Sequence, residues 1–252
     1  MDSARRVQEA RDLREGVAEG LDSAKRAAAR HAVHQLVRPR MPIALGTGST
    51  AAFAVRSIAE EFPHGGFDCV ASSRATEELA TSLGLSVRPL RGDDRFDLML
   101  DGADEVSPSL DLTKGGGGAL LREKLLAHLS RSVVILVDPT KLVDALGSKV
   151  PIPVEVVPFA RAVVEREAAA LGYRVRLRTV REGTAFRTDN GNEILDLVPH
   201  EPLRSPREAD RALRGLVGVV ETGLFTGLAD RVVVGRADGT IEERVRSPPR
   251  AV

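Results

Sequence analysis

The residues best suited to chemistry lie in two short segments, one acidic and one rich in glycine. The acidic segment, Asp101-Gly102-Ala103-Asp104-Glu105, places three carboxylates where an apolar run, FDLML, ends. Clustered carboxylates repel one another, so they are a poor choice for stability alone. They suit a ligand rich in hydroxyl groups, general acid–base catalysis, or a hard metal ion such as Mg²⁺. The alternative is a solvated acidic turn.

The glycine-rich segment is the sharpest feature of the sequence. Lys114 is followed by the glycines Gly115–Gly118 and then by the apolar-patterned run ALLREKLLAHL, in which Glu123 comes early. Consecutive glycines lose much backbone entropy on ordering, which a chain tolerates where a ligand approaches the backbone closely. A cation, exposed amides and a carboxylate could therefore converge on one anionic substrate. A flexible linker, the alternative, rarely runs straight into such a helix.

A third segment, Gly46-Thr47-Gly48-Ser49-Thr50-Ala51, matches the loose pattern G-x-G-x-x-G/A. A dinucleotide site would want an acid at the end of the next strand, but that strand ends in Ser72 and Ser73. The segment also lacks the Gly-Lys-Ser/Thr of a P-loop. What remains is a glycine turn with hydroxyl groups at a helix N-terminus, which favours a phosphate group. An ordinary strand-to-helix turn is the alternative.

Other candidate positions carry weaker signals. Ser72–Thr76 fits a helix N-cap better than a ligand contact. Lys141 follows a strand in DPTK and adds a cation at a strand end, although a plain surface position is the alternative. The histidines show no metal spacing of note, and none is given a role. Cys69, the one cysteine, lies in an apolar stretch and is expected to be a buried thiol.

The spacing of apolar runs and glycine turns predicts an α/β fold: a Rossmann-like parallel sheet flanked by helices, with a second, smaller α+β domain of ferredoxin-like type. Ligands of such sheets bind at the carboxyl ends of the strands, where the segments above fall. Strands are expected within 42–50, 67–73, 86–90, 96–105 and 132–138. Helices are expected over about 50–62, 75–85 and 119–129.

The proline-rich stretch VPIPVEVVP breaks this rhythm and indicates a domain junction. We expect a Rossmann-like domain over 21–148 and 227–246, because RVVVG fits a last strand returning to the first sheet. The smaller domain would span 149–226, with helices over 159–171 and 205–216, strands over 173–179 and 193–198, and a turn at 189–192. Residues 1–40 predict one or two helices, the second capped by Asp22 or Ser23, and residues 1–20 an extension that is loosely held.

Composition excludes several classes of function. Lys plus Arg and Asp plus Glu both number 36, there is no Trp, and aromatic residues make up 3% of the chain, which argues against a nucleic-acid partner. No apolar run is long enough for a membrane helix, and neither a signal peptide nor a typical transit peptide is indicated, so a cytoplasmic protein is expected. A single cysteine excludes an internal disulfide framework and a multi-cysteine zinc site.

Taken together and in this order, GTGST, SSxxT, DGADE, KGGGGALxREK, DPTK and PIPVEVVPFA resemble the ribose-5-phosphate isomerase A family, as do TDNGNEILD and GVVETGLFTGLADRVVVG. The resemblance runs from about residue 21 to 245. It implies interconversion of ribose 5-phosphate and ribulose 5-phosphate in the pentose phosphate pathway, without a metal or redox cofactor, by an enzyme that is a homodimer or homotetramer. The motifs are specific as a set, although each alone is not.

The resemblance also implies roles for single residues. Glu123 would be the base that moves a proton between C1 and C2 through a cis-enediolate, and Lys114 would stabilise the enediolate oxygen. Asp101 and Asp104 would bind sugar hydroxyls and assist ring opening. The residues expected to line the substrate, chiefly at its phosphate and along the glycine loop, are Thr47, Gly48, Ser49, Thr50, Gly102, Ala103, Gly115, Gly116, Gly117 and Lys141.

The sequence departs from the family's pattern at two places, and the position of Glu123 at a helix N-terminus conflicts with its implied role as a base. Ala44 stands where the family leads us to expect a glycine, and either Lys25 or Arg26 takes the place of a lysine near the phosphate. A helix N-terminus lowers a carboxylate's pKa, so Glu123 must be desolvated by neighbours such as Leu120, or act with its pKa unraised.

Two other functions stay open on the sequence. A sugar-phosphate-sensing domain of a regulator would carry about 50 basic residues in a helix-turn-helix ahead of the sensor, and would not need Lys114 and Glu123. A nicotinamide-dependent dehydrogenase would need the acid at the strand end that this chain lacks.

Overall fold

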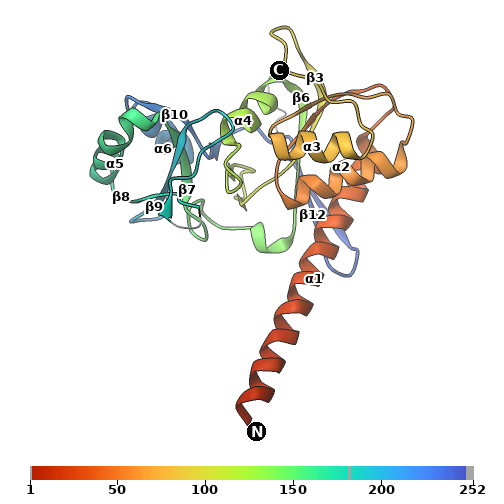
Figure 1. Ribbon diagram of the computed structural model, residues 1–252, viewed down its shortest axis with the longest axis horizontal. Coiled ribbons are helices and arrows are strands. Elements are labelled where there is room, and N and C mark those ends of the chain that lie inside the picture. Colours follow the sequence, from red (N-terminus) through yellow and green to blue (C-terminus); the bar gives the residue numbers. More distant parts are fainter. Residues whose placement is uncertain (1, 181–182, 248–252) are drawn as a thin grey trace.

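The computed structural model describes residues 2–180 and 183–247, and its strands form three sheets. The large sheet and a smaller four-stranded sheet lie side by side, joined by the glycine loop, α4 (Leu120–Leu129) and the segments around them (Figure 1). This arrangement confirms the predicted fold class, a mostly parallel sheet flanked by helices with a separate small α+β unit.

The large sheet has six strands in the order β13-β12-β6-β3-β1-β2. Every neighbouring pair is parallel except β12 with β13, so the sequence's RVVVG run does return to the first sheet beside β6. The strands are β1 (Pro42–Leu45), β2 (Asp68–Ala71), β3 (Phe96–Gly102), β6 (Ser130–Val137), β12 (Arg231–Gly235) and β13 (Ile241–Val245).

Both faces of this sheet are covered, and the alternation of side chains along each strand divides them between two cores. In β3, Leu98 and Leu100 pack in the core formed with α1 (Asp2–Leu36), α2 (Ser49–Glu61) and α3 (Arg74–Ser82). Met99, between them, packs on the opposite face with Leu120 and Leu126 of α4. Runs that are apolar at every position are therefore explained by burial on both sides.

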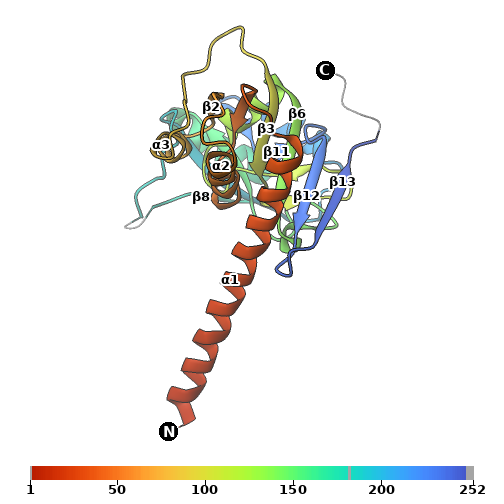
Figure 2. The ribbon, with the colours of Figure 1, turned by 90° about the vertical axis from the view of Figure 1, so that its right-hand side faces the viewer.

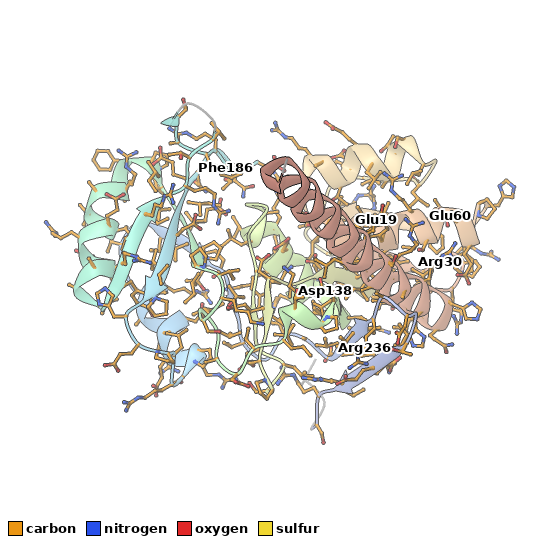
Figure 3. The ribbon with its side chains drawn as sticks, turned by 90° about the horizontal axis from the view of Figure 1, so that it is seen from below. Glu19, Arg30, Glu60, Asp138, Phe186 and Arg236 are labelled. Atoms are coloured by element: carbon orange, nitrogen blue, oxygen red, sulfur yellow. The ribbon has the colours of Figure 1, made fainter. Side chains whose placement is uncertain are left out.

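Helix α1 is a single helix, so the predicted cap of a second helix at Asp22 or Ser23 is wrong. Its C-terminal half packs on the sheet through small residues such as Ala28 and Ala32, and Arg30 pairs with Glu60 of α2 at 3.7 Å (Figure 3). Its N-terminal half extends away from both sheets (Figures 1 and 2). That residues 1–20 are loosely held stays a prediction. None of the described helices combines the length and apolar character needed to cross a membrane.

The smaller sheet has the chain order β-α-β-β-α-β and the spatial order β10-β7-β9-β8, with all neighbours antiparallel. This is the ferredoxin-like arrangement. Its core joins apolar residues of α5 and α6 to those of the strands. The elements are β7 (Ile152–Val156), α5 (Arg161–Ala170), β8 (Tyr173–Leu177), β9 (Glu193–Pro199), α6 (Pro206–Arg214) and β10 (Val219–Thr222).

The proline-rich stretch interpreted as a junction contains β7, a fully buried strand of the smaller sheet that the sequence did not predict. Pro153 is tolerated there because the N–H and C=O of a strand residue point to the same side. Its carbonyl accepts from the Gly223 N–H at 2.6 Å, where β10 has already ended, so its missing N–H breaks no bond to β9.

Two further differences from the sequence prediction concern short pairings. The strand expected over 86–90 is reduced to one bridge between Val87 and Cys69, whose thiol is buried as predicted. A third sheet of three short strands was not predicted at all. Its members are β4 (Glu105–Val106), β5 (Leu112–Thr113) and β11 (Leu224–Phe225). Two-residue strands carry no period that a sequence can show.

The close approach of α1 to β12 yields a stability test. A Cβ at Gly235 would lie 2.1 Å from the Ala24 carbonyl oxygen, so Gly235→Ala must push the helix from the sheet. We expect a loss of about 1–3 kcal/mol in the free energy of unfolding, measured by urea denaturation. Gly92→Ala, where nothing lies within 4 Å of the added carbon, is the control and should change little. Equal effects of the two substitutions would contradict this packing.

Candidate active site

A buried ammonium group lies at the centre of the site. Lys114, which follows β5, is only 3% exposed. Its Nζ lies 2.9 Å from Asp101 Oδ2 and 3.4 Å from Glu123 Oε2, and it donates to the Gly102 carbonyl at 2.6 Å. The ring of Phe225 lies beneath it at 5.5 Å. Lys114 therefore joins the end of β3 to the first turn of α4.

Asp101 is fully buried at the end of β3, where its carboxylate is held by backbone as well as by Lys114. Its Oδ1 accepts from the N–H groups of Gly102 at 2.8 Å and Thr47 at 3.1 Å. A glycine is needed at position 46, because a Cβ there would lie 2.1 Å from the Asp101 carboxyl. The acidic strand end and the GTGST turn are thus one packed unit.

Glu123 is 3% exposed in the first turn of α4, close behind the fully buried Leu120. Burial raises the pKa of its carboxyl to about 8; the Lys114 ammonium acts in the opposite direction, and the charges of Asp101 and Asp104 add to the rise. Desolvation therefore outweighs the nearby Lys114 ammonium, and the pKa of Glu123 is raised, a point that the sequence left open.

The carboxyls of Asp101 and Glu123 share the Lys114 ammonium, and this sharing determines which of them is protonated. Burial raises the pKa of Asp101 too, while Lys114 and two backbone N–H groups lower it. Although burial favours its neutral form, the charges of Asp101 and Glu123 hold the pKa of Lys114 above its ordinary value. Asp101 has the closer ammonium and the backbone donors, so a proton shared by the carboxyl pair resides better on Glu123.

The glycine loop faces Asp104 at the rim of the site. Gly116 N–H donates to Asp104 Oδ2 at 2.8 Å, and a Cβ at Gly116 would lie 2.9 Å from that carboxylate. Gly115 has φ +98°, which favours glycine, and its own Cβ would meet Leu120 at 2.9 Å. The loop's glycines therefore allow both its turn and its close packing.

These groups line one cavity together with the start of α2 and two more lysines. Gly48 is the N-cap of α2 with φ +101°, and no side chain caps the helix, so its first N–H groups are available to a ligand. Lys141 reaches the same cavity. The lining residues are Lys25, Thr47, Gly48, Ser49, Thr50, Gly102, Ala103, Asp104, Lys114, Gly115, Gly116, Gly117, Glu123 and Lys141.

The structure also answers which of two basic residues reaches the cavity. Lys25 lines it from α1, whereas the Arg26 guanidinium stacks over the Phe53 ring at 5.3 Å. The sequence could not distinguish them, because the choice depends on the rotation of α1 about its axis.

One acid of the acidic segment does not belong to the site. Glu105 is fully buried away from the cavity, where it accepts from the N–H groups of Gly147 at 2.6 Å and Lys149 at 2.7 Å and from Thr113 Oγ1 at 2.8 Å. The sequence grouped it with Asp101 and Asp104 because the three are neighbours in the chain. β3 ends at Gly102, however, and Glu105 begins β4 in a different sheet, where it has a structural role.

The weaker candidates occupy supporting positions. Ser73 caps α3 by accepting from Thr76 N–H at 3.2 Å, as the N-cap interpretation predicted, and its hydroxyl bonds to Thr47 Oγ1 at 2.9 Å. Asp138 accepts from Thr140 N–H at 2.9 Å and so holds the turn that carries Lys141. Among the side chains that the structure describes, within residues 18–180 and 183–247, no three His, Cys, Asp or Glu are placed to hold a metal ion.

Comparison with known proteins agrees with this geometry. Residues 68–239 match the family Ribose 5-phosphate isomerase A (phosphoriboisomerase A). The chain belongs to this family. Ribose-5-phosphate isomerase A of Thermomicrobium roseum is 47% identical over 223 residues, covering 87% of this chain and 93% of that protein. The Sphingopyxis alaskensis protein of the same name is 48% identical over 205 residues, covering 80% and 88%.

Solved structures of the family share the fold. Ribose 5-phosphate isomerase from Plasmodium falciparum superposes with a TM-score of 0.86 at 32% identity, covering 90% of this chain and 100% of that one. A D-ribose-5-phosphate isomerase in complex with phospho-erythronic acid gives 0.85 at 34% identity, covering 90% and 99%. Membership of this family makes the protein an isomerase and removes the grounds for the sensor and dehydrogenase alternatives.

The buried cluster predicts a pH-dependent cost of removing its ammonium. Lys114→Met leaves two buried carboxyls without a compensating charge. The free energy of unfolding, measured with urea at pH 8.5, should therefore be about 3–5 kcal/mol lower than in the wild type. The pKa values of both carboxyls in the folded state then rise further, and the folded state gains stability as pH falls toward about 5.5, so the deficit should shrink.

Lys149→Met is the control for this test, because it removes an exposed ammonium that donates to the carbonyls of Thr140 and Leu142 and pairs with no carboxylate among the described residues. It should change the free energy of unfolding by less than about 1 kcal/mol at either pH. A Lys114→Met deficit that is the same at both pH values would contradict the electrostatic account.

Proposed function

We propose that the protein interconverts D-ribose 5-phosphate and D-ribulose 5-phosphate through a cis-enediolate, with Glu123 as the base. The observation that carries the proposal is the buried Glu123 carboxyl, with a pKa near 8, beside Lys114 on a cavity that also offers an uncapped helix N-terminus. A carboxylate with a pKa near neutrality is an effective general base. Family membership and the relatives' names support the choice of substrate.

The phosphate group of the sugar is assigned to the N-terminus of α2. This helix start, with Ser49 and Thr50, lines the cavity together with Lys25 and Lys141; the Lys25 ammonium also pairs with Asp22 at 3.2 Å. Backbone donors, hydroxyls and cations are the groups that bind phosphate in proteins. Anchored there, the sugar would extend toward Lys114 and Glu123.

The chemical step moves one proton between two carbons. In the open-chain aldose, the Glu123 carboxylate takes the C2 proton, the C2–H electrons form a C1–C2 double bond, and the aldehyde oxygen takes up negative charge. The Glu123 carboxyl then returns the proton to C1 while the C2 hydroxyl proton passes to the C1 oxygen, which leaves the ketose. Lys114 and the glycine-loop amides stabilise the charge on oxygen.

The two aspartates take different parts in this proposal. Asp104 lines the cavity, where it can bind sugar hydroxyls and assist ring opening. Asp101 is fully buried and holds Lys114, so it acts on the reaction through that ammonium. A relative's complex with phospho-erythronic acid fits the scheme, since a carboxylate carries negative charge on two neighbouring oxygens as an enediolate does.

The wider setting of the enzyme is also a proposal. We assign the reaction to the non-oxidative pentose phosphate pathway, in the cytoplasm, with no cofactor, and we expect a homodimer or homotetramer.

The function is tested by running the reaction in deuterated water. Purified protein incubated with ribose 5-phosphate should give ribulose 5-phosphate carrying deuterium at C1, because the proton held by Glu123 exchanges with solvent. The product and its label are measured by nuclear magnetic resonance. Absence of ketose would contradict the proposed activity, and ketose without deuterium would point to direct hydride transfer instead of an enediolate.

Replacing the base tests the role of Glu123. Glu123→Gln keeps the shape of the side chain but removes its capacity to accept a proton, so kcat should fall by at least about 100-fold. Binding of phospho-erythronic acid, measured by calorimetry, should stay within about threefold of wild type. Glu60→Gln, at an exposed position of α2, is the control and should keep full activity. A Glu123→Gln protein with wild-type turnover would remove Glu123 from the mechanism.

A further inference from the structure

Arg178, next to the small sheet, extends its side chain to the glycine loop. Arg178 continues β8, where its N–H donates to the Ile194 carbonyl at 2.8 Å. Its guanidinium reaches out of the sheet, and Nη1 donates to the carbonyls of Gly115 at 2.8 Å and Gly116 at 3.1 Å. These two peptide groups belong to the loop that borders Lys114 and Asp104.

The guanidinium is itself held in place by neighbours from its own sheet. Asp196 of β9 pairs with it through two bonds, Nε to Oδ2 at 3.0 Å and Nη2 to Oδ1. The Phe186 ring lies 5.9 Å away, between the small sheet and the large one (Figure 3), and packs where a Cβ at Gly118 would lie. Because the guanidinium is planar and one of its edges is held by the Asp196 carboxylate, its remaining N–H donors point in one direction.

This direction decides which way the loop's amides point. In a trans peptide the C=O and the N–H that follows it point to opposite sides. With the carbonyls of Gly115 and Gly116 turned to Arg178, the N–H groups of Gly116 and Gly117 turn away from it. Gly116 N–H accordingly meets Asp104 at 2.8 Å. Gly117 lines the cavity, and within the described residues its N–H has no hydrogen-bond partner.

We infer that Arg178 is a positioning residue for the reaction: by holding two glycine carbonyls, it keeps the Gly116 amide on Asp104 and aims the Gly117 amide at the sugar. The inference rests on the proposed function. A four-glycine loop has many accessible conformations, so an external anchor is needed to keep its donors directed before substrate binds. The cation on the carbonyl side also polarises each peptide and makes its N–H a stronger donor.

The test compares Arg178→Met with Arg174→Met. Arg174 lies on β8, four residues before Arg178, and is exposed; its side chain makes no hydrogen bond or ion pair within the described residues, which makes it the matched control. For Arg178→Met, kcat for ribose 5-phosphate should fall about 10- to 100-fold, which is less than the roughly 100- to 1,000-fold lost when an oxyanion donor is removed, because the amide is still present but no longer held. KM should stay within about threefold, because the amides act mainly on charge that develops during the reaction.

Two further variants separate positioning from folding. Arg178→Lys should lose only about 3- to 10-fold in kcat, since an ammonium can bond one carbonyl but cannot pair with Asp196 as a fork. Asp196→Asn should give a similar partial loss, which keeps the inference testable if Arg178→Met does not fold. Arg174→Met should retain wild-type kcat and KM.

Amide hydrogen exchange supplies a readout that does not depend on turnover. In Arg178→Met, exchange should be faster than in Arg174→Met over the peptide that contains residues 115–118, where Gly116 and Gly118 N–H groups are bonded. An inactive wild type would defeat the proposed function alone. A folded Arg178→Met protein with wild-type kcat, or with unchanged exchange in the loop, would overturn the inference.

Discussion

The structure depends on one electrostatic constraint: the Lys114 ammonium must compensate two buried carboxyls, Asp101 and Glu123. Backbone N–H groups serve one carboxyl and not the other, so the two differ in how readily they hold a proton. The asymmetry makes Glu123 a group whose proton can leave and return near neutral pH. Burial of the two carboxyls lowers the stability of the fold, and it also raises the pKa of Glu123, on which its proposed role as a base depends.

The two sheets divide the work of holding this cluster. The parallel sheet supplies the strand ends and the N-terminus of α2, which fix Asp101 and the proposed phosphate site. The antiparallel sheet approaches the glycine loop from the opposite side through Arg178. A loop of four glycines cannot fix its own conformation, and here it lies between two rigid supports.

Much of this organisation could be predicted from the sequence because it is local. A glycine turn after a strand, a run of glycines before a helix, and alternating strands and helices each leave a pattern in the chain. The failures have tertiary causes. Glu105 lies one residue from Asp104, yet its carboxylate binds backbone N–H groups away from the cavity. β7 was missed because it contains Pro153, whose missing N–H lies on the side of β10 and beyond the end of that strand. The choice of Lys25 over Arg26 depends on how α1 is rotated about its axis. Arg178 gave no signal, because its partners are backbone carbonyls far away in the chain.

The most direct test of this account is the protonation state of Glu123 in the resting enzyme. Infrared spectra of the wild type should show a protonated-carboxyl band that is lost as the pH rises through about 8, and Glu123→Gln should lack that band. This result is expected because the account places a proton on the Glu123 carboxyl of the buried pair. If every carboxyl in the wild type is already ionised above about pH 6, as ordinary glutamates are, the central claim is contradicted.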